Sequence, residues 1–281
     1  MKADSDRWRR VVNDTEVQAI AAKFVEARLS ASPLAGFPGE VPPDLETAYR
    51  CQDAAIKLWP DAISGWKVGR IPPTLEDKFR SDRLAGPIFV PTIHYTEFDQ
   101  QLELPVYAGG FAAIEAEFVI VVDSDAPLEK LEWTRNEADE MIRNLRIGLE
   151  MASSPLKIIN DLGPAAIVSD FGNNAGLIVG PSIKDWRSRT LESMSCEAFI
   201  EGRSVGKGGA SRLTGGPVRS MQFILELAAR RGRPLRAGDV IATGQTTGIH
   251  DIKVGETAHI SFGEDGDIHC RAIKAAASRR N

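Results

Sequence analysis

The chain has 281 residues, of which 43 % are hydrophobic and 26 % charged, a composition typical of a soluble globular enzyme of one or two domains. Its net charge of −5 gives no indication of a nucleic-acid or membrane partner, and no apolar run approaches the ~20 residues of a transmembrane helix. Three scattered cysteines argue against disulfides and zinc knuckles and favour a reducing cytoplasm: Cys51, Cys196 and Cys270. The charged N-terminus MKADSDRWRR has no apolar signal core behind it, so we expect a cytoplasmic protein.

Two amphipathic helices are predicted near the N-terminus. Apolar residues at helical spacing predict the first helix over Asp14–Ser30 and the second from about Asp44 to Trp59. A loop rich in proline and glycine separates them. Because this pair is too small to be a convincing independent fold, we interpret residues 1–62 as a helical cap packed on a catalytic body of residues 63–281.

Short strands are predicted to follow the cap. The strand ISGWKVGR (Ile63–Arg70) carries Lys67 between two glycines, which let another backbone or a substrate approach closely. The alternative interpretation of Lys67 is an exposed strand lysine. Residues 71–80 are polar and are predicted to be a mobile segment, and residues 86–95 are predicted to form one or two strands broken by a proline.

The stretch Phe111–Val122, FAAIEAEFVIVV, is predicted to be a buried strand because almost all of its residues are apolar. Side chains alternate between the faces of a strand, so Glu115 and Glu117 share one face, roughly 7 Å apart along the strand. Two unpaired carboxylates in an apolar setting repel each other and are costly to desolvate. A divalent cation between them is the simplest solution. The alternatives are an edge strand with both carboxylates in water, and a glutamate–arginine pair.

A third carboxylate follows in the middle of the chain. Thr134 and Glu137 form a capping box that begins a helix predicted over Asn136–Leu145. RIGLEMA (Arg146–Ala152) is predicted to be a strand that carries Glu150 among apolar residues. Further on, the sequence predicts a helix opened by a proline and ended by a glycine over residues 217–232, a strand and turn over residues 239–248, and a β-hairpin over residues 257–273.

Three glutamates from two strands and a lysine from a third make a candidate site for a hard cation. All-oxygen ligation suits Mg²⁺, Mn²⁺ or Ca²⁺ better than zinc. The motifs G-x-G-x-x-G, G-x-S-x-G, Walker A and H-E-x-x-H are absent, which argues against nucleotide binding, serine hydrolysis and zinc proteolysis.

The order GWKVG, GPIF, IEAEF, GLEMASSP and GDVIATG resembles the 2-keto-4-pentenoate hydratase and 4-oxalocrotonate decarboxylase branch of the fumarylacetoacetase superfamily. The resemblance covers about residues 15 to 265. It implies an α+β fold, in which a mixed β-roll or sandwich with an N-terminal helical cap encloses a Mg²⁺ site. It also implies a small-molecule 2-oxo acid substrate and a homo-oligomer of two or more chains.

The resemblance also assigns roles to residues. Glu115 and Glu117 fall on the family's E-x-E metal ligands, Glu150 falls on its third ligand, and Lys67 matches its active-site lysine. Asp170, in DFGNN, is the second expected catalytic residue, and the turn of Thr243 and Gly244 is expected to line the substrate pocket. Where the hydratases usually carry an Asp-Asp pair, this chain has Val90-Pro91-Thr92, so the sequence supports the site more strongly than it supports the hydration step.

The expected function is that of a divalent-metal-dependent lyase acting on a small 2-oxo or 2-hydroxy-dienoic acid of aromatic catabolism. A cation that stabilises an enolate serves hydration, decarboxylation and hydrolysis alike, so the site indicates a substrate class rather than one reaction. We expect a cation to depress the pKa of Lys67, which would favour its exchange of a proton. A 4-oxalocrotonate-type decarboxylase, an acylpyruvate hydrolase with His94 as its candidate histidine, and a non-catalytic ligand-binding relative remain alternatives.

Overall fold

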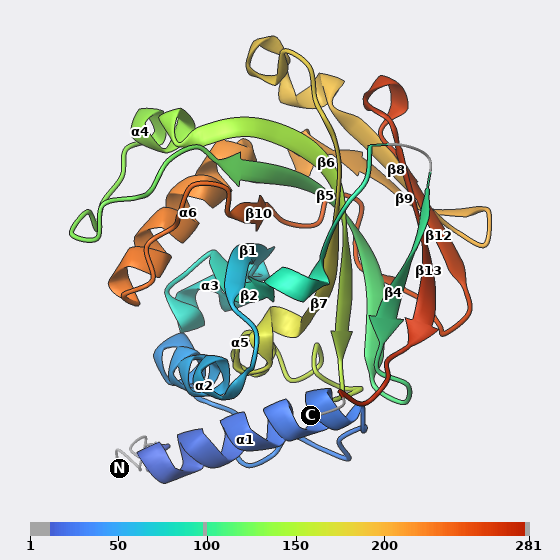
Figure 1. Cartoon of the computed structure of the whole chain (residues 1–281). Coiled ribbons are helices and arrows are strands. Elements are labelled where there is room, and N and C mark those ends of the chain that lie inside the picture. The colour runs from blue at the N-terminus through green and yellow to red at the C-terminus, as the bar shows by residue number, and fades with distance from the viewer. Residues whose placement is uncertain (1–11, 98–99, 279–281) are drawn as a thin grey trace, which may run out of the picture.

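The computed structural model describes residues 12–97 and 100–278, so the charged segment MKADSDRWRR lies outside the described residues. Helices gather around a β-rich body (Figure 1), which agrees with the predicted α+β class. The α-helices of the described residues are α1 (Asp14–Ser30), α2 (Leu45–Leu58), α3 (Pro73–Phe79), α4 (Arg135–Glu140), α5 (Pro164–Ser169) and α6 (Gly216–Arg230).

The larger of two sheets is mixed and curled, and its long β5 and β6 arch across the molecule (Figure 1). In spatial order its strands are β2 (Arg83–Phe89), β1 (Ile63–Arg70), β10 (Val240–Ala242), β5 (Phe111–Val122), β6 (Ile142–Ser154), β7 (Asn174–Ser182) and β3 (Ile93–Tyr95). The short strand β11 (His250–Asp251) also pairs with β5. These strands bring segments far apart in the chain onto one surface.

The smaller sheet forms a second layer. Its strands in spatial order are β4 (Gln101–Val106), β13 (Asp267–Lys274), β12 (Thr257–Ser261), β8 (Ser195–Ile200) and β9 (Arg203–Gly209). The rings of Phe118 on β5 and Phe262 just beyond β12 meet edge to face, with centroids 5.6 Å apart. One face of β5 therefore packs toward the second sheet.

The predicted strand Phe111–Val122 is confirmed as β5, with the same bounds. It is a central strand, paired antiparallel with β6 on one side and with β10 and β11 on the other. Glu115 and Glu117 are buried on the face opposite to Phe118. The alternative of an edge strand with both carboxylates in water is therefore wrong.

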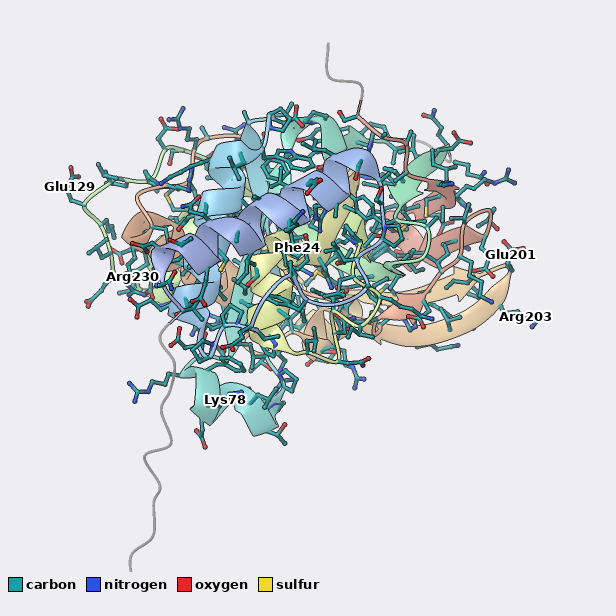
Figure 2. All side chains as sticks on the ribbon, turned by 90° about the horizontal axis from the view of Figure 1, so that it is seen from below. Phe24, Lys78, Glu129, Glu201, Arg203 and Arg230 are labelled. Atoms are coloured by element: carbon teal, nitrogen blue, oxygen red, sulfur yellow. The ribbon has the colours of Figure 1, made fainter. Side chains whose placement is uncertain are left out.

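The two predicted N-terminal helices are also confirmed. Asn13 caps α1 and forms a capping box with Glu16, because each side chain accepts a hydrogen bond from the other residue's backbone N–H. Figure 2 looks onto α1, which crosses this face of the molecule, and Phe24 of α1 is fully buried. Charged residues lie at the periphery of the same view: Lys78, Glu129, Glu201, Arg203 and Arg230. The division of the chain into a cap and a body stays a prediction.

One local prediction is wrong, and a second stays untested. The helix expected over Asn136–Leu145 is the shorter α4, and β6 already begins at Ile142 because this residue pairs with Val122 of β5. The pairing with β5 overrides local helix propensity. The segment 71–80, expected to be mobile, contains α3, which begins at Pro73, where a proline fits the first turn of a helix.

Candidate metal centre

The structure brings the three predicted glutamates together on one face of the curled sheet. Glu115 on β5 lies directly opposite Glu150 on β6, and Glu117 lies opposite Gly148. One carboxylate oxygen from each of the three glutamates lies within 4.8 Å of the others. All three side chains are buried. This arrangement is compact enough for the three carboxylates to ligate one cation, although their role as ligands stays a prediction.

The hydrogen bonds of the cluster leave oxygen atoms without partners. Glu117 Oε2 accepts a 2.7 Å hydrogen bond from the backbone N–H of Gly244, and Glu150 Oε1 accepts a 2.9 Å bond from Asn174 Nδ2. Glu117 Oε1 and Glu150 Oε2 are buried and have no hydrogen-bond partner among the described residues. Buried polar atoms without partners are rare and costly, and ligation of a cation would satisfy them. The donor set therefore fits a divalent cation.

Lys67 lies at the same site. It is adjacent to Ala242 of β10, which pairs in turn with Val119 of β5, so Lys67 shares the face of the glutamates. Its Nζ is 3.3 Å from Glu150 Oε1 and donates to Asn173 Oδ1 at 3.2 Å. Lys67 is only 4 % exposed, so its interpretation as an exposed strand lysine is wrong.

Gly65, two residues before Lys67, allows close backbone packing. A Cβ on Gly65 would lie 2.3 Å from the carbonyl oxygen of Val240. The close approach expected at this glycine is therefore made by the parallel strand β10, which is one of the two possibilities that the sequence left open. The register that places Lys67 over the glutamates depends on this contact.

The ionisation of the cluster reflects an excess of negative charge. Burial raises the pKa of Glu115 to about 7, although the nearby Lys67 ammonium opposes this rise. Burial, together with repulsion from Glu150 and Glu115, raises the pKa of Glu117 well above its usual range. Burial alone would lower the pKa of Lys67, but its attraction to the three carboxylates raises it instead. The protein's own charges thus act on Lys67 in the direction opposite to that expected from a cation.

A turn between α5 and β7 holds both Lys67 and Glu150. Its residues Asn173 and Asn174 make the contacts to these two side chains described above. Sequence reasoning missed both asparagines, although the letters DFGNN had drawn attention to the segment because of Asp170. The signal that could have found them is a run of two amides beside a glycine, which is typical of a polar turn with left-handed backbone.

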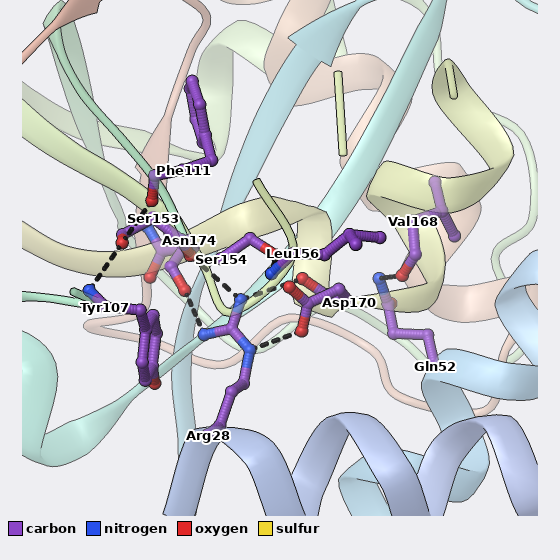
Figure 3. A network of polar contacts seen from close by, with 10 residues as sticks. All are labelled: Arg28, Gln52, Tyr107, Phe111, Ser153, Ser154, Leu156, Val168, Asp170 and Asn174. Carbon is purple, nitrogen blue, oxygen red and sulfur yellow. Dashed lines mark hydrogen bonds and ion pairs between the residues drawn. The ribbon is translucent and has the colours of Figure 1, made fainter. Parts of the chain in front are cut away.

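Asp170 opens the same turn but does not join the carboxylate cluster. Its Oδ1 accepts a 2.5 Å hydrogen bond from Nε of Arg28, and both side chains are buried (Figure 3). Arg28 comes from α1, far away in the sequence, and sequence reasoning missed it. The catalytic role assigned to Asp170 stays a prediction, and the ion pair gives Asp170 a structural partner.

Thr243 and Gly244 form the turn after β10, next to Glu117. Thr243 Oγ1 donates to the carbonyl oxygen of Phe118 at 2.7 Å, which fixes the turn along β5. Gly244 has φ = 121°, a conformation that residues with a Cβ rarely adopt, and in it the backbone N–H faces Glu117. Both residues line a cavity of about 640 Å³, whose rim also carries Arg70 and Arg212. Their contact with substrate stays a prediction.

His94 lies away from the glutamates. It is on β3, and β7 separates this strand from β6, so two strand spacings, about 10 Å, lie between His94 and the strand of Glu150. Among residues 12–97 and 100–278, the candidate group of metal-binding side chains consists of the three glutamates. This position weakens the hydrolase alternative, which relied on His94.

The sequence is similar to curated hydratases, although no family model matches it. The 2-keto-4-pentenoate hydratase of Burkholderia vietnamiensis (strain G4 / LMG 22486) is 23 % identical over 254 residues, covering 88 % of this chain and 95 % of that protein. The hydratase of the same name from Paraburkholderia phymatum is 23 % identical over 257 residues, with the same coverage. The similarity therefore extends over nearly the whole length of both relatives.

The fold is similar to that of solved enzyme structures. The 4-oxalocrotonate decarboxylase from Pseudomonas putida G7, complexed with magnesium and adipate, superposes with a TM-score of 0.76 at 19 % identity, covering 94 % of this chain and 100 % of that one. Fumarylpyruvate hydrolase from Pseudomonas aeruginosa, in complex with Mn²⁺ and pyruvate, gives a TM-score of 0.56 at 15 % identity, covering 75 % and 89 %. The similarity in sequence to 2-keto-4-pentenoate hydratases and in fold to a 4-oxalocrotonate decarboxylase supports the resemblance to that branch of the fumarylacetoacetase superfamily.

Proposed function

We propose that this chain is a divalent-cation-dependent lyase that acts on a small 2-oxo or 2-hydroxy-dienoic acid, as 2-keto-4-pentenoate hydratases do. The observation that carries the proposal is the cluster of three buried carboxylates with unsatisfied oxygens beside a buried lysine. Gly244, whose backbone N–H donates to Glu117, lines a cavity large enough for a small organic acid. We assign Glu115, Glu117 and Glu150 as the cation ligands.

The bound cation would supply a positive centre that orients the carboxylate and 2-oxygen of the substrate and stabilises negative charge developing there. Lys67 Nζ is held by Glu150 and Asn173 at the edge of this centre, where it can donate a proton to a substrate carbon or accept one from it. The turn of Thr243 and Gly244 lines the substrate cavity and orients Glu117. The turn of Thr243 and Gly244, together with β1, would keep bulk water away from the buried carboxylates.

Decarboxylation is the second candidate reaction, and one observation favours it. The 3₁₀ turn of Val90–Thr92, where the hydratases usually carry two aspartates, has no carboxylate to activate a water molecule. Loss of CO₂ from a 2-oxo-dienedioic acid needs no such water. It breaks a carbon–carbon bond, moves the electron pair toward the 2-oxygen, and requires only that a group such as Lys67 return a proton to carbon.

We also propose Mg²⁺ as the ion, a reducing cytoplasm as the location, and a homo-oligomer as the assembly. Oxygen ligation supports Mg²⁺ and leaves Mn²⁺ and Ca²⁺ as substitutes. The cysteines Cys51, Cys196 and Cys270 are all free and buried, which supports a reducing compartment. No helix of residues 12–97 or 100–278 is long and apolar enough to cross a membrane. The proposal of a homo-oligomer rests on the family resemblance.

The test is turnover of 2-hydroxypenta-2,4-dienoate and of 4-oxalocrotonate, each followed by its loss of ultraviolet absorbance with Mg²⁺ present. We expect activity on at least one substrate, complete loss with excess chelator, and recovery when Mg²⁺ is restored. Activity on the second substrate alone would identify a decarboxylase. Binding of either acid without any turnover would instead support the non-catalytic relative.

A further inference from the structure

We infer that Arg28 of α1 is a positioning residue of the metal centre, which it serves by holding the turn Asp170–Asn174 in shape. The inference rests on the proposed function, because it takes Glu150 as a ligand of the cation. Arg28 touches none of the three glutamates in the hydrogen bonds of the described residues. Its effect is transmitted through the turn.

The turn has an unfavourable backbone conformation. Three consecutive residues have positive φ values: 53° at Phe171, 67° at Gly172 and 55° at Asn173. Residues with a Cβ adopt this left-handed region at a cost in free energy, and usually one at a time. A strained turn persists only where surrounding contacts hold it, so the contacts of this turn decide where its asparagines point.

Arg28 supplies contacts at both ends of the turn (Figure 3). At its start, Nε and Nη2 donate to Oδ1 and to the carbonyl oxygen of Asp170, at 2.5 and 3.1 Å. At its end, Nη1 donates to the carbonyl oxygen of Asn174 at 2.9 Å, and Nη2 also reaches the carbonyl oxygen of Ser153 on β6 at 3.2 Å. The planar guanidinium can span these acceptors together, which a lysine ammonium cannot do.

The guanidinium itself is fixed in place. Arg28 is 5 % exposed, and its guanidinium carbon lies 5.3 Å from the ring centroids of both Tyr107 and Phe171. An arginine so enclosed by aromatic rings and hydrogen bonds has little freedom to move without moving the turn. The rigidity of α1 therefore reaches the turn.

The turn contacts the side chains of the metal centre directly, so its conformation affects where they lie. Asn174 Nδ2 donates to Glu150 Oε1, and Asn173 Oδ1 accepts from Lys67 Nζ. The packing is tight as well, since a Cβ on Gly172 would lie 3.0 Å from both Gly86 Cα and Lys67 Cδ. Groups that orient a metal ligand in this way typically change metal affinity 10- to 100-fold when they are lost.

The experiment measures Mn²⁺ binding by the electron paramagnetic resonance of free Mn²⁺, and kcat and KM in parallel. The main variant is Arg28→Met with Asp170→Asn, which removes both charges together. We expect a 10- to 100-fold loss of Mn²⁺ affinity and a fall in kcat larger than the change in KM. Arg28→Lys, which keeps the charge beside Asp170 but cannot span the turn, should give an intermediate loss.

The matched control is Asp53→Asn with Arg231→Met. This ion pair, 2.7 Å between Asp53 Oδ1 and Arg231 Nη2, also ties an N-terminal helix to the body, and it makes no contact with the three glutamates. Both double variants should melt at lower temperature. Only the Arg28 variants should lose Mn²⁺ affinity, a change that a purely structural role would not produce.

Each result decides one question. Wild-type affinity for Mn²⁺ in the folded Arg28 double variant would overturn the inference. If that variant does not fold, Arg28→Lys decides in the same way, because it retains the ion pair. Absence of Mn²⁺ binding by the wild-type protein would overturn the proposed metal centre, and the inference with it, whereas binding by the wild type together with unchanged binding by the variants would overturn the inference alone.

Discussion

Two clusters of buried charge meet at the turn Asp170–Asn174, and they differ in balance. Arg28 and Asp170 form one pair of opposite charges, and the remaining donors of the guanidinium bind backbone carbonyls. The other cluster sets three carboxylates against the single ammonium of Lys67. Buried ions are tolerated when they are paired with opposite charges. The charges of Arg28 and Asp170 balance each other, whereas the three glutamates have only one ammonium beside them and would be stabilised by a further positive charge.

This difference separates structural from chemical roles. Asp170 was predicted to be catalytic from its place in DFGNN, yet its buried partner is an arginine that cannot give up its proton. Lys67 and the glutamates share one site, and the pKa values of Lys67, Glu115 and Glu117 depart from the usual ones in a manner typical of functional sites. We therefore propose that Lys67 transfers the proton and that Asp170 supports the turn.

Removal of residues 1–62 should have the largest effect, because it takes Arg28 away from Asp170. We propose that these residues are a cap that is needed by the body, since α1 and α2 bury their apolar faces against it. A chain beginning at Ile63 should aggregate, as measured by size-exclusion chromatography. A cooperative thermal melt of that shortened chain, free of aggregates, would show that the cap is dispensable.

Replacement of Lys67 by Met should have the next largest effect, which is on kcat. It removes the one positive charge beside the three glutamates and so increases the excess of negative charge there. The apolar stem is retained and the ammonium is lost. If Lys67 moves the proton, kcat falls about 10²–10⁴-fold while Mn²⁺ affinity does not weaken, since a competing positive charge has been removed.

The split between kcat and KM tests this role. A variant with a raised KM and an unchanged kcat would show that Lys67 only binds the substrate. A variant equal to the wild type on every 2-oxo-dienoic acid would exclude both roles.

The central strand and its glutamates could be predicted from sequence because their signals are local. The apolar run Phe111–Val122 predicts a strand, and alternation places Glu115 and Glu117 on one face. The convergence of Glu150 and Lys67 on the same site was a hypothesis from the residue types, and the family resemblance strengthened it. It depends on the register of β6, β10 and β1 with β5, which no periodicity encodes.

Contacts between distant segments account for what was missed. Arg28 looks like any other basic residue near the end of a helix, and only the packing of α1 onto the turn makes it a buried partner of Asp170. The strand β4 contains Pro105, which argues against a strand, yet it pairs in parallel with β13 at the end of the chain. Tertiary pairing decided both outcomes.

Replacement of Glu117 by Gln should reduce the excess of negative charge in the glutamate cluster. With a chelator present, the variant should be more stable than the wild type, because repulsion from Glu150 and Glu115 is relieved. With Mg²⁺ it should lose most of the stabilisation by the ion, which is about 3 kcal/mol at 100 times the dissociation constant. Urea denaturation with and without Mg²⁺ measures the free energy of unfolding in chelator and the stabilisation by the ion. Glu192→Gln, at an exposed position, serves as a control that should change neither quantity.

The pH dependence of stability should be the smallest effect. It measures directly the excess of negative charge among the three glutamates. The pKa of Glu115 is raised by burial from 4.5 to about 7, so between these values the folded chain binds more protons than the unfolded one. In the presence of chelator, the free energy of unfolding should therefore fall as pH rises from about 4.5 to about 7. Neighbouring carboxylates share the proton, so this fall belongs to the cluster and not to Glu115 alone.

Glu115→Gln tests whether the slope of the free energy of unfolding against pH comes from Glu115. It cannot titrate, so its stability should change less with pH over the same window. Saturating Mg²⁺ should flatten the curve of the wild type as well, because a bound cation favours the ionised carboxylates. A wild-type stability that rises with pH in chelator would mean that the three carboxylates are compensated within the protein itself, and the contrast between the two clusters would then be wrong.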